Sequence, residues 1–276
     1  MTRSSIFLPF HRLPPGLQAA DTRHPPVEPL PAATVILLRP GSEGMEVLLL
    51  RRPLQSSFAA GAWVFPGGRV DPGDADERTT NRIQGSVSHP AFLAAAVREA
   101  LEETGLPVAL HGQADPVIPA AAHPARSSLL EERSTLAEIL EAEDWWIHGN
   151  RLALVAHWVT PVGEARRYDT RFFAAGVPTD WEGDVQGGEL TEGRWLTPRQ
   201  ALGRNREGGF PMLFPTVHTL EILLPYSHPD GLLADFRHRE IPTFAPRLAA
   251  QEGGMVIHLW DDDTGGSGAR RSPGNA

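Results

Sequence analysis

Short runs of apolar and β-branched residues mark the first part of the chain as strands. Residues 32–38 and 45–51 are two such runs, and the Pro and Gly residues between them predict a hairpin. A third, shorter strand is expected at residues 63–65. Residues 1–30 are rich in proline and polar side chains, so we expect them to form an irregular arm on the domain.

The pattern then changes to a helix that ends at Gly105. Residues 94–97 are small and apolar with good helix propensity. Gly105 is typical of a left-handed helix cap, and Pro107 prevents the helix from resuming. Residues 127–141 have leucine and isoleucine at near-helical spacing with glutamates between them, which predicts an amphipathic helix. This helix would form an insertion over about residues 125–147.

Strands and helices continue in the second half. Thr197 is expected to cap a helix that starts at Pro198, directly after a strand that contains Trp195. The other predicted elements are strands at residues 152–160, 171–175 and 255–260 and an amphipathic helix at residues 217–224. Residues 261–276 are a Gly, Ser and Arg tail that should be disordered. The folded domain would then span residues 31–260.

Composition excludes several classes of protein. The chain of 276 residues is 41% hydrophobic and contains no run of 18 apolar residues, so a membrane span is not expected. The net charge of −9 argues against nucleic-acid binding, which needs a basic surface. The absence of cysteine excludes disulfides and fits a cytoplasmic protein. A secretory signal is not expected, because residues 1–30 contain no apolar core behind a basic start.

Three glutamates at the end of the predicted central helix are the strongest chemical signal. Glu99, Glu102 and Glu103 stand at i, i+3 and i+4, so their carboxylates share one face of the helix. Mg²⁺ or Mn²⁺, which prefer oxygen ligands, would relieve the repulsion among them. Arg98 can pair with Glu102 and fix its rotamer. The alternative is a solvated helix face, on which such charges bind no metal.

In these residues the chain resembles the Nudix hydrolases. The motif of that family is a glycine, five residues, an acid, seven residues, and then Arg-Glu-apolar-x-Glu-Glu-x-Gly-apolar. Gly68 and Asp74 match the first part, and residues 98–106 match every fixed position of the second. The chain departs from the motif in two ways. Asp74 replaces the usual Glu, and 23 residues separate it from Arg98, which is an insertion of 16 over about residues 75–90 that we expect to be exposed.

The resemblance implies an α/β fold, namely an α/β/α sandwich with a mixed β-sheet, here with the helical insertion added. It also implies a Mg²⁺- or Mn²⁺-dependent enzyme that cleaves a diphosphate linkage, an acid anhydride of phosphorus. The metal ligands would be Glu99, Glu102, Glu103 and the Gly68 carbonyl, with Asp74 in an outer-shell contact. The general base would be Glu189 or Glu192, with Glu189 preferred, although Glu102 or Glu103 is an alternative.

Further segments resemble the branch of the family that contains the mammalian peroxisomal coenzyme A diphosphatase and its bacterial relatives. They are residues 33–38, 158–161, 167–173, 195–198 and 214–216. Coenzyme A or acyl-CoA is therefore one expected substrate; the alternatives are ADP-ribose, NADH, nucleoside triphosphates and a non-catalytic nucleotide sensor. The candidate phosphate-binding residues are Arg51, Arg52, Arg167 and Arg171. An Asp169–Arg171 ion pair would instead be structural, and the oligomeric state, a homodimer included, stays open.

Overall fold

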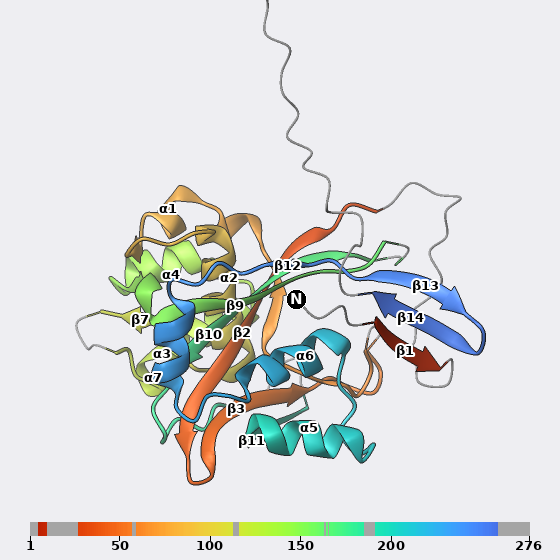
Figure 1. Cartoon of the computed structure of the whole chain (residues 1–276). Helices are drawn as coiled ribbons and strands as arrows, with labels where there is room; N and C mark the ends of the chain where they lie inside the picture. The colour runs from red at the N-terminus through yellow and green to blue at the C-terminus, as the bar shows by residue number, and fades with distance from the viewer. Residues whose placement is uncertain are drawn as a thin grey trace, which may run out of the picture.

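The computed structural model of the chain describes residues 5–9, 27–56, 59–112, 116–162, 164, 166–184 and 191–258 (Figure 1). Its centre is a mixed eight-stranded sheet in the order β11-β3-β2-β10-β9-β12, with β4 paired to β3 and β5 paired to β2. The strands of this sheet are β2 (Leu30–Gly41), β3 (Gly44–Arg51), β4 (Trp63–Val64), β5 (Gly67–Arg69), β9 (Leu152–Val159), β10 (Tyr168–Gly176), β11 (Glu192–Leu196) and β12 (Thr243–Phe244).

The predicted first hairpin is present, and its strands run farther toward the turn than expected. Arg39 and Pro40 pair with Glu46 and Met45, so only Ser42 and Glu43 lie outside the two strands. Strand β2 is the hub of the sheet. It pairs antiparallel with β3 and β5 and parallel with β10, which places Ala33 between Gly68 on one side and Arg171 on the other.

Helices cover both faces of the sheet, as the predicted sandwich requires. Alternate residues of β2 point to opposite faces: Val35 and Leu37 pack under helix α2, whereas Ile36 and Leu38 belong to the core on the other face. Helices α2 (Pro90–Thr104), α3 (Pro119–Leu130) and α4 (Leu136–Ala142) form the first layer. Helices α5 (Pro198–Arg206), α6 (Phe214–Leu223) and α7 (Pro229–Phe236) form the second.

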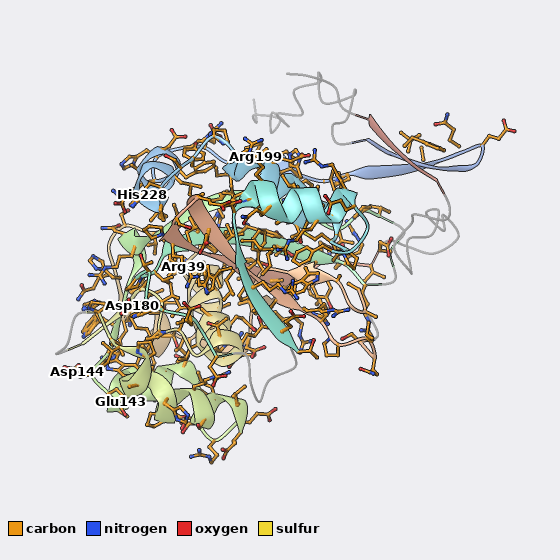
Figure 2. The ribbon with its side chains drawn as sticks, turned by 90° about the horizontal axis from the view of Figure 1, so that it is seen from below. Arg39, Glu143, Asp144, Asp180, Arg199 and His228 are labelled. Atoms are coloured by element: carbon orange, nitrogen blue, oxygen red, sulfur yellow. The ribbon has the colours of Figure 1, made fainter. Side chains whose placement is uncertain are left out.

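The helical insertion contains two helices, so the prediction of one continuous helix over residues 127–141 was wrong. Thr135 accepts a hydrogen bond from the Glu138 N–H, and the Glu138 carboxylate accepts one from the Thr135 N–H. This capping box starts α4 and separates it from α3. Glu143 and Asp144, just beyond α4, lie at the outer edge of the molecule (Figure 2).

The insertion in the motif does not simply bulge outward as expected. It contains the short helix α1 (Glu77–Thr80), in which Thr79 is buried, and strand β6 (Ile83–Gln84), and it follows directly on the 3-10 helix η2 (Pro72–Asp74). Strand β6 pairs parallel with β8 (Trp146–His148), which pairs in turn with β7 (Leu110–His111). Arg78 also reaches Glu141 of α4 at 2.6 Å. The two insertions therefore fold against each other.

The ends of the described chain meet in a third sheet. Strand β1 (Ser5–Pro9) pairs with β14 (Gly254–His258), which pairs with β13 (Arg247–Gln251). The expectation of an irregular arm was thus wrong for residues 5–9, and α7 was not predicted at all. Figure 1 shows this sheet standing off one end of the main sheet. No helix among the described ranges has both the length and the apolar character needed to cross a membrane. The predicted tail, residues 261–276, lies outside them.

Candidate active site

Helix α2 carries the three glutamates to the strands of the glycine turn. Its buried apolar face includes Leu93, Val97 and Leu101 and packs on the sheet. Gly105 ends it with φ 69°, and the Gly105 N–H donates to the Leu101 carbonyl. The predicted left-handed cap is therefore present, and residues 98–103 are held against β5.

Arg98 is the centre of the acidic cluster. Its side chain is buried, with 7% of the residue exposed. Nη1 donates to Glu99 Oε1 at 2.8 Å and to Glu102 Oε2 at 2.9 Å, so the predicted pairing with Glu102 is present. Burial by itself lowers the pKa of Arg98, but its hydrogen bonds to Asp74 and the nearby negative carboxylates raise the pKa well above its usual value. Arg98 therefore stays charged and holds two glutamates in one place.

Asp74 fixes the other side of the same guanidinium. Its carboxylate accepts hydrogen bonds from Arg98 Nε at 3.0 Å and Nη2 at 2.9 Å, and the Asp71 N–H donates to it at 2.8 Å. Only 1% of Asp74 is exposed, and this burial raises its pKa. Sequence reasoning did not foresee the contact with Arg98, because the long insertion hides how close the two residues are.

The glycine turn touches the glutamates directly. The Gly67 N–H donates to Glu103 Oε2 at 2.9 Å. At Gly68, a Cβ atom would lie 2.7 Å from Cδ of Glu99 and closer still to Oε1. Only glycine fits there without displacing Glu99, as expected for a turn that brings backbone close to the acids. Gly68, Arg98 and all three glutamates thus form one cluster.

Comparison with known proteins agrees with this geometry. The family model of the NUDIX domain matches residues 28–214. This chain belongs to the Nudix family. The crystal structure of a NUDIX hydrolase from Alicyclobacillus acidocaldarius superposes with a TM-score of 0.67 at 27% identity, covering 75% of this chain and 96% of that one. The expected α/β/α fold is therefore confirmed.

A relative in Caenorhabditis elegans, "Putative nudix hydrolase 7", is 28% identical over 174 residues. The match covers 63% of this chain and 54% of the relative, so the chain spans about half the length of that protein. Both relatives are named as hydrolases of the Nudix family.

The chemistry of the Nudix cluster fits a hard divalent cation. Its donors are all oxygens, which Mg²⁺ and Mn²⁺ prefer. Burial raises the pKa of Glu99 to about 7 and also raises that of Glu102, so a bound cation would stabilise the ionised form of both carboxylates. Within the described residues, no three acidic or histidine side chains converge on one point at metal-binding distance. An ion would replace the present hydrogen bonds of Glu99, Glu102 and Glu103.

The four predicted phosphate-binding arginines lie at different places in the Nudix domain. Arg51 is half-exposed at the end of β3, 3.8 Å from Glu192, and Arg52 follows it. Arg167 instead donates to the backbone carbonyls of Thr160 and Val27.

Arg171 forms the structural ion pair that was the alternative to a substrate contact. Its Nη1 lies 3.2 Å from Asp169 Oδ1, and its guanidinium carbon lies 3.9 Å from the centre of the Phe92 ring. The candidate base Glu189 lies outside the described residues. The other candidate, Glu192, starts β11 beside Arg51.

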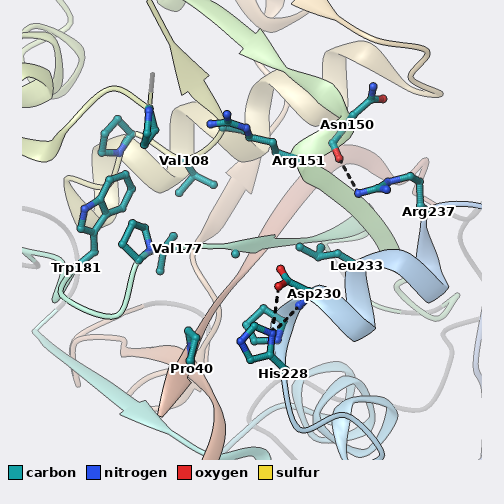
Figure 3. Close-up of a pocket in the computed structure, with 16 residues that line it drawn as sticks. Pro40, Val108, Asn150, Arg151, Val177, Trp181, His228, Asp230, Leu233 and Arg237 are labelled. Atoms are coloured by element: carbon teal, nitrogen blue, oxygen red, sulfur yellow. Dashed lines mark hydrogen bonds and ion pairs between the residues drawn. The ribbon is translucent and has the colours of Figure 1, made fainter. Parts of the chain in front are cut away.

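A cavity of about 430 Å³ lies elsewhere in the molecule (Figure 3). Its lining includes Trp181, Val177 and Leu233, but none of the glutamates of the cluster. The polar groups at its rim bond to one another: Arg237 donates to the Asn150 carbonyl, and His228 lies 3.4 Å from Asp230 (Figure 3). This cavity is therefore separate from the carboxylate site.

Proposed function

We propose that this Nudix domain is a Mg²⁺- or Mn²⁺-dependent hydrolase that cleaves the diphosphate linkage of a substrate built on a nucleoside diphosphate. One observation carries the proposal. Glu99 and Glu102 bond to the buried Arg98, and Glu103 accepts a hydrogen bond from the Gly67 N–H of the glycine turn. Glu99 is buried, and Glu102 and Glu103 are partly buried. Burial of charged carboxylates is costly unless a cation shares the site, so the arrangement favours metal binding over a solvated helix face.

In the proposed reaction, a bound divalent ion would neutralise the bridging phosphates and lower the pKa of the attacking water. Glu99, Glu102, Glu103 and the Gly68 carbonyl would hold this ion. Arg98 keeps Glu99 and Glu102 in fixed rotamers, and it is itself fixed by Asp74. This second layer limits how far the carboxylates move when they exchange a hydrogen bond for the ion. An outer-shell contact of Asp74 with the ion belongs to the same proposal.

The general base is assigned to Glu189, with Glu192, Glu102 and Glu103 as the alternatives. The base should give the low-pH limb of the rate profile, because only its carboxylate form accepts a proton from water. Glu189→Gln and Glu192→Gln should therefore be compared by the pH dependence of kcat. The variant that loses the low-pH limb together with most of the turnover identifies the base.

The first substrates to test are coenzyme A and acyl-CoAs, which would yield 3′,5′-ADP and phosphopantetheine or its acyl derivative. The support is the resemblance of several segments to the coenzyme A diphosphatase branch. Arg51 and Arg52 at the end of β3 are the candidate contacts for phosphates outside the metal site, because guanidinium groups bind phosphate in a bidentate manner. ADP-ribose, NADH and nucleoside triphosphates are the alternatives, and the proposed location is the cytoplasm.

The test is a hydrolysis screen over these substrates with Mg²⁺, with Mn²⁺ and with EDTA, in which products are identified by mass. We expect cleavage within a diphosphate linkage that depends on the metal. If calorimetry detects binding of a nucleotide but no substrate is turned over, the alternative of a non-catalytic nucleotide sensor is favoured. Cleavage that is unchanged in EDTA would contradict the proposed mechanism.

A further inference from the structure

We propose that Arg126, in helix α3 of the helical insertion, is a positioning residue that fixes the carboxylate-bearing end of α2 for metal binding. The inference rests on the proposed function and gives the insertion a part in it. Arg126 acts through the backbone of the helix that carries the glutamates, because its Nε donates to the Glu102 carbonyl.

The guanidinium of Arg126 joins three segments of the chain. Only 6% of the residue is exposed. Nε donates to the carbonyl of Glu102 at 3.1 Å, Nη1 donates to Asp184 Oδ2 at 3.0 Å, and Nη2 donates to the Asp184 carbonyl at 2.6 Å. Asp184 then returns to the same helix, because its N–H donates to the Thr104 carbonyl at 2.6 Å. The result is a closed link between α3, the end of α2 and the segment before β11.

This link supplies hydrogen-bond donors to the carbonyls at the end of α2. The last four carbonyls of an α-helix have no partner within the helix, and they carry its negative dipole end. In α2 the Leu101 carbonyl is satisfied by Gly105, the Glu102 carbonyl by Arg126 and the Thr104 carbonyl by Asp184. The positive charge of the buried Arg126 also interacts favourably with the negative end of the helix dipole. Arg126 therefore holds the turn on which Glu102 and Glu103 stand.

The absence of a side chain at Gly105 leaves space for the Arg126 guanidinium. A Cβ atom on Gly105 would lie 3.3 Å from Nη1 of Arg126, which is closer than most side chains pack, and at an ordinary contact distance of 3.5 Å from Cδ. The left-handed φ of 69° at Gly105 ends the helix at the same place. One residue thus both stops α2 and leaves room for the arginine that fixes it.

The consequence concerns geometry more than stability. Glu102 bonds to Arg98 and Glu103 to the Gly67 N–H, so both side chains are already positioned by contacts of their carboxylates. Arg126 positions the backbone of this turn through its hydrogen bond to the Glu102 carbonyl. A displacement of about 1 Å in a catalytic group can cost about 10²-fold in rate. Loss of Arg126 should therefore weaken metal binding and slow the reaction while the domain stays folded.

The test compares Arg126→Ala and Arg126→Lys with the wild type. Arg133→Ala is the matched control, because Arg133 is an exposed arginine just past the same helix and pairs with Glu131. Mn²⁺ binding is measured by electron paramagnetic resonance titration, which needs no turnover. We expect about tenfold weaker Mn²⁺ binding and a fall in kcat of about 10–10²-fold in R126A, with KM little changed. R126K should recover part of both, and R133A should match the wild type.

Circular dichroism and thermal melts establish that each variant is folded. If R126A does not fold, Asp184→Ala decides, because the Asp184 side chain is 57% exposed and its loss leaves the backbone contact in place. D184A should weaken Mn²⁺ binding in the same direction. Wild-type Mn²⁺ affinity and kcat in folded R126A, or in D184A where R126A does not fold, would overturn the positioning role alone. Wild-type protein that binds Mn²⁺ but hydrolyses no substrate would contradict the proposed function alone.

Discussion

Arg98 and Asp74 form a buried ion pair although they stand 24 positions apart in the chain. The two nitrogens Nε and Nη2 donate to the Asp74 carboxylate, and Nη1 remains for Glu99 and Glu102. Asp74 therefore determines which way the guanidinium faces. The insertion between the two residues does not disturb this contact, because its own helix and strand pack against α4 and β8.

The first prediction concerns Asp74. Asp74→Asn keeps the shape of the side chain but removes the charge that Arg98 faces, and a hydrogen bond to a charged group contributes about 1.5–3 kcal/mol. We expect a loss of stability of that order, measured by urea unfolding, and a fall in kcat of about tenfold or more as Glu99 and Glu102 lose their fixed partner. Asp76→Asn is the control, because Asp76 caps α1 in the exposed part of the insertion and Asn caps as well. Equal effects of the two variants would contradict the role of Asp74.

The second prediction concerns the glycine turn. Gly68→Ala should displace Glu99, because the new Cβ would lie 2.7 Å from Cδ of that residue. We expect weaker metal activation, measured as the Mg²⁺ concentration that gives half-maximal rate. Gly73→Ala is a matched control within the same motif, since the only atom near a Cβ there is Thr135 Cβ at 3.9 Å. An unchanged Mg²⁺ requirement in G68A would show that Glu99 is not held where the metal binds.

Much of the site could be predicted from local sequence. The spacing of Glu99, Glu102 and Glu103 requires only the period of a helix, and Gly105 marks where that helix ends. The contacts that hold the site in place are different. Asp74 reaches Arg98 across a 23-residue insertion, and Arg126 reaches the Glu102 carbonyl from another helix. No periodicity in the sequence encodes such distant contacts.

The errors in the fold have local causes. Leu129, Leu136 and Leu140 fit a helical period, and this pattern hid the capping box of Thr135 that divides the segment into α3 and α4. Strand β1 is too short and too near proline to be recognised, and its pairing with β14 joins the two ends of the described chain. The register of β2 with β10 likewise placed Arg171 under Phe92, which sequence reasoning could not distinguish from a substrate contact.

The third prediction concerns stability without metal. Burial raises the pKa of Glu99 to about 7, from a usual value of 4.5. Between these two values the folded protein binds a proton that the unfolded chain has lost, so the free energy of unfolding should fall as the pH rises from about 4.5 to 7. At about 1.4 kcal/mol per pKa unit, the contribution of Glu99 is at most about 3–4 kcal/mol.

Urea unfolding in EDTA at several pH values measures this decline. Glu99→Gln has no proton to lose, so the difference in stability between wild type and E99Q isolates the contribution of Glu99 from those of Asp74 and Glu102. Saturating Mg²⁺ should reduce the decline, because the ion favours the ionised carboxylate. A difference between wild type and E99Q that stays constant with pH would contradict the raised pKa.

The fourth prediction concerns Glu102, which bonds to Arg98 and is a ligand in the proposed metal site. Glu102→Gln retains an oxygen that accepts the hydrogen bond from Arg98 Nη1, so the fold should remain intact. The neutral amide is a poor ligand for a divalent ion, and turnover should fall by about 10²-fold or more, since metal-bound water is the proposed nucleophile. Steady-state rates at saturating Mg²⁺ are compared with those of Glu143→Gln, an exposed glutamate beyond α4 (Figure 2). Rates in E102Q that equal those of wild type and E143Q would remove the assignment of this helix as the catalytic element.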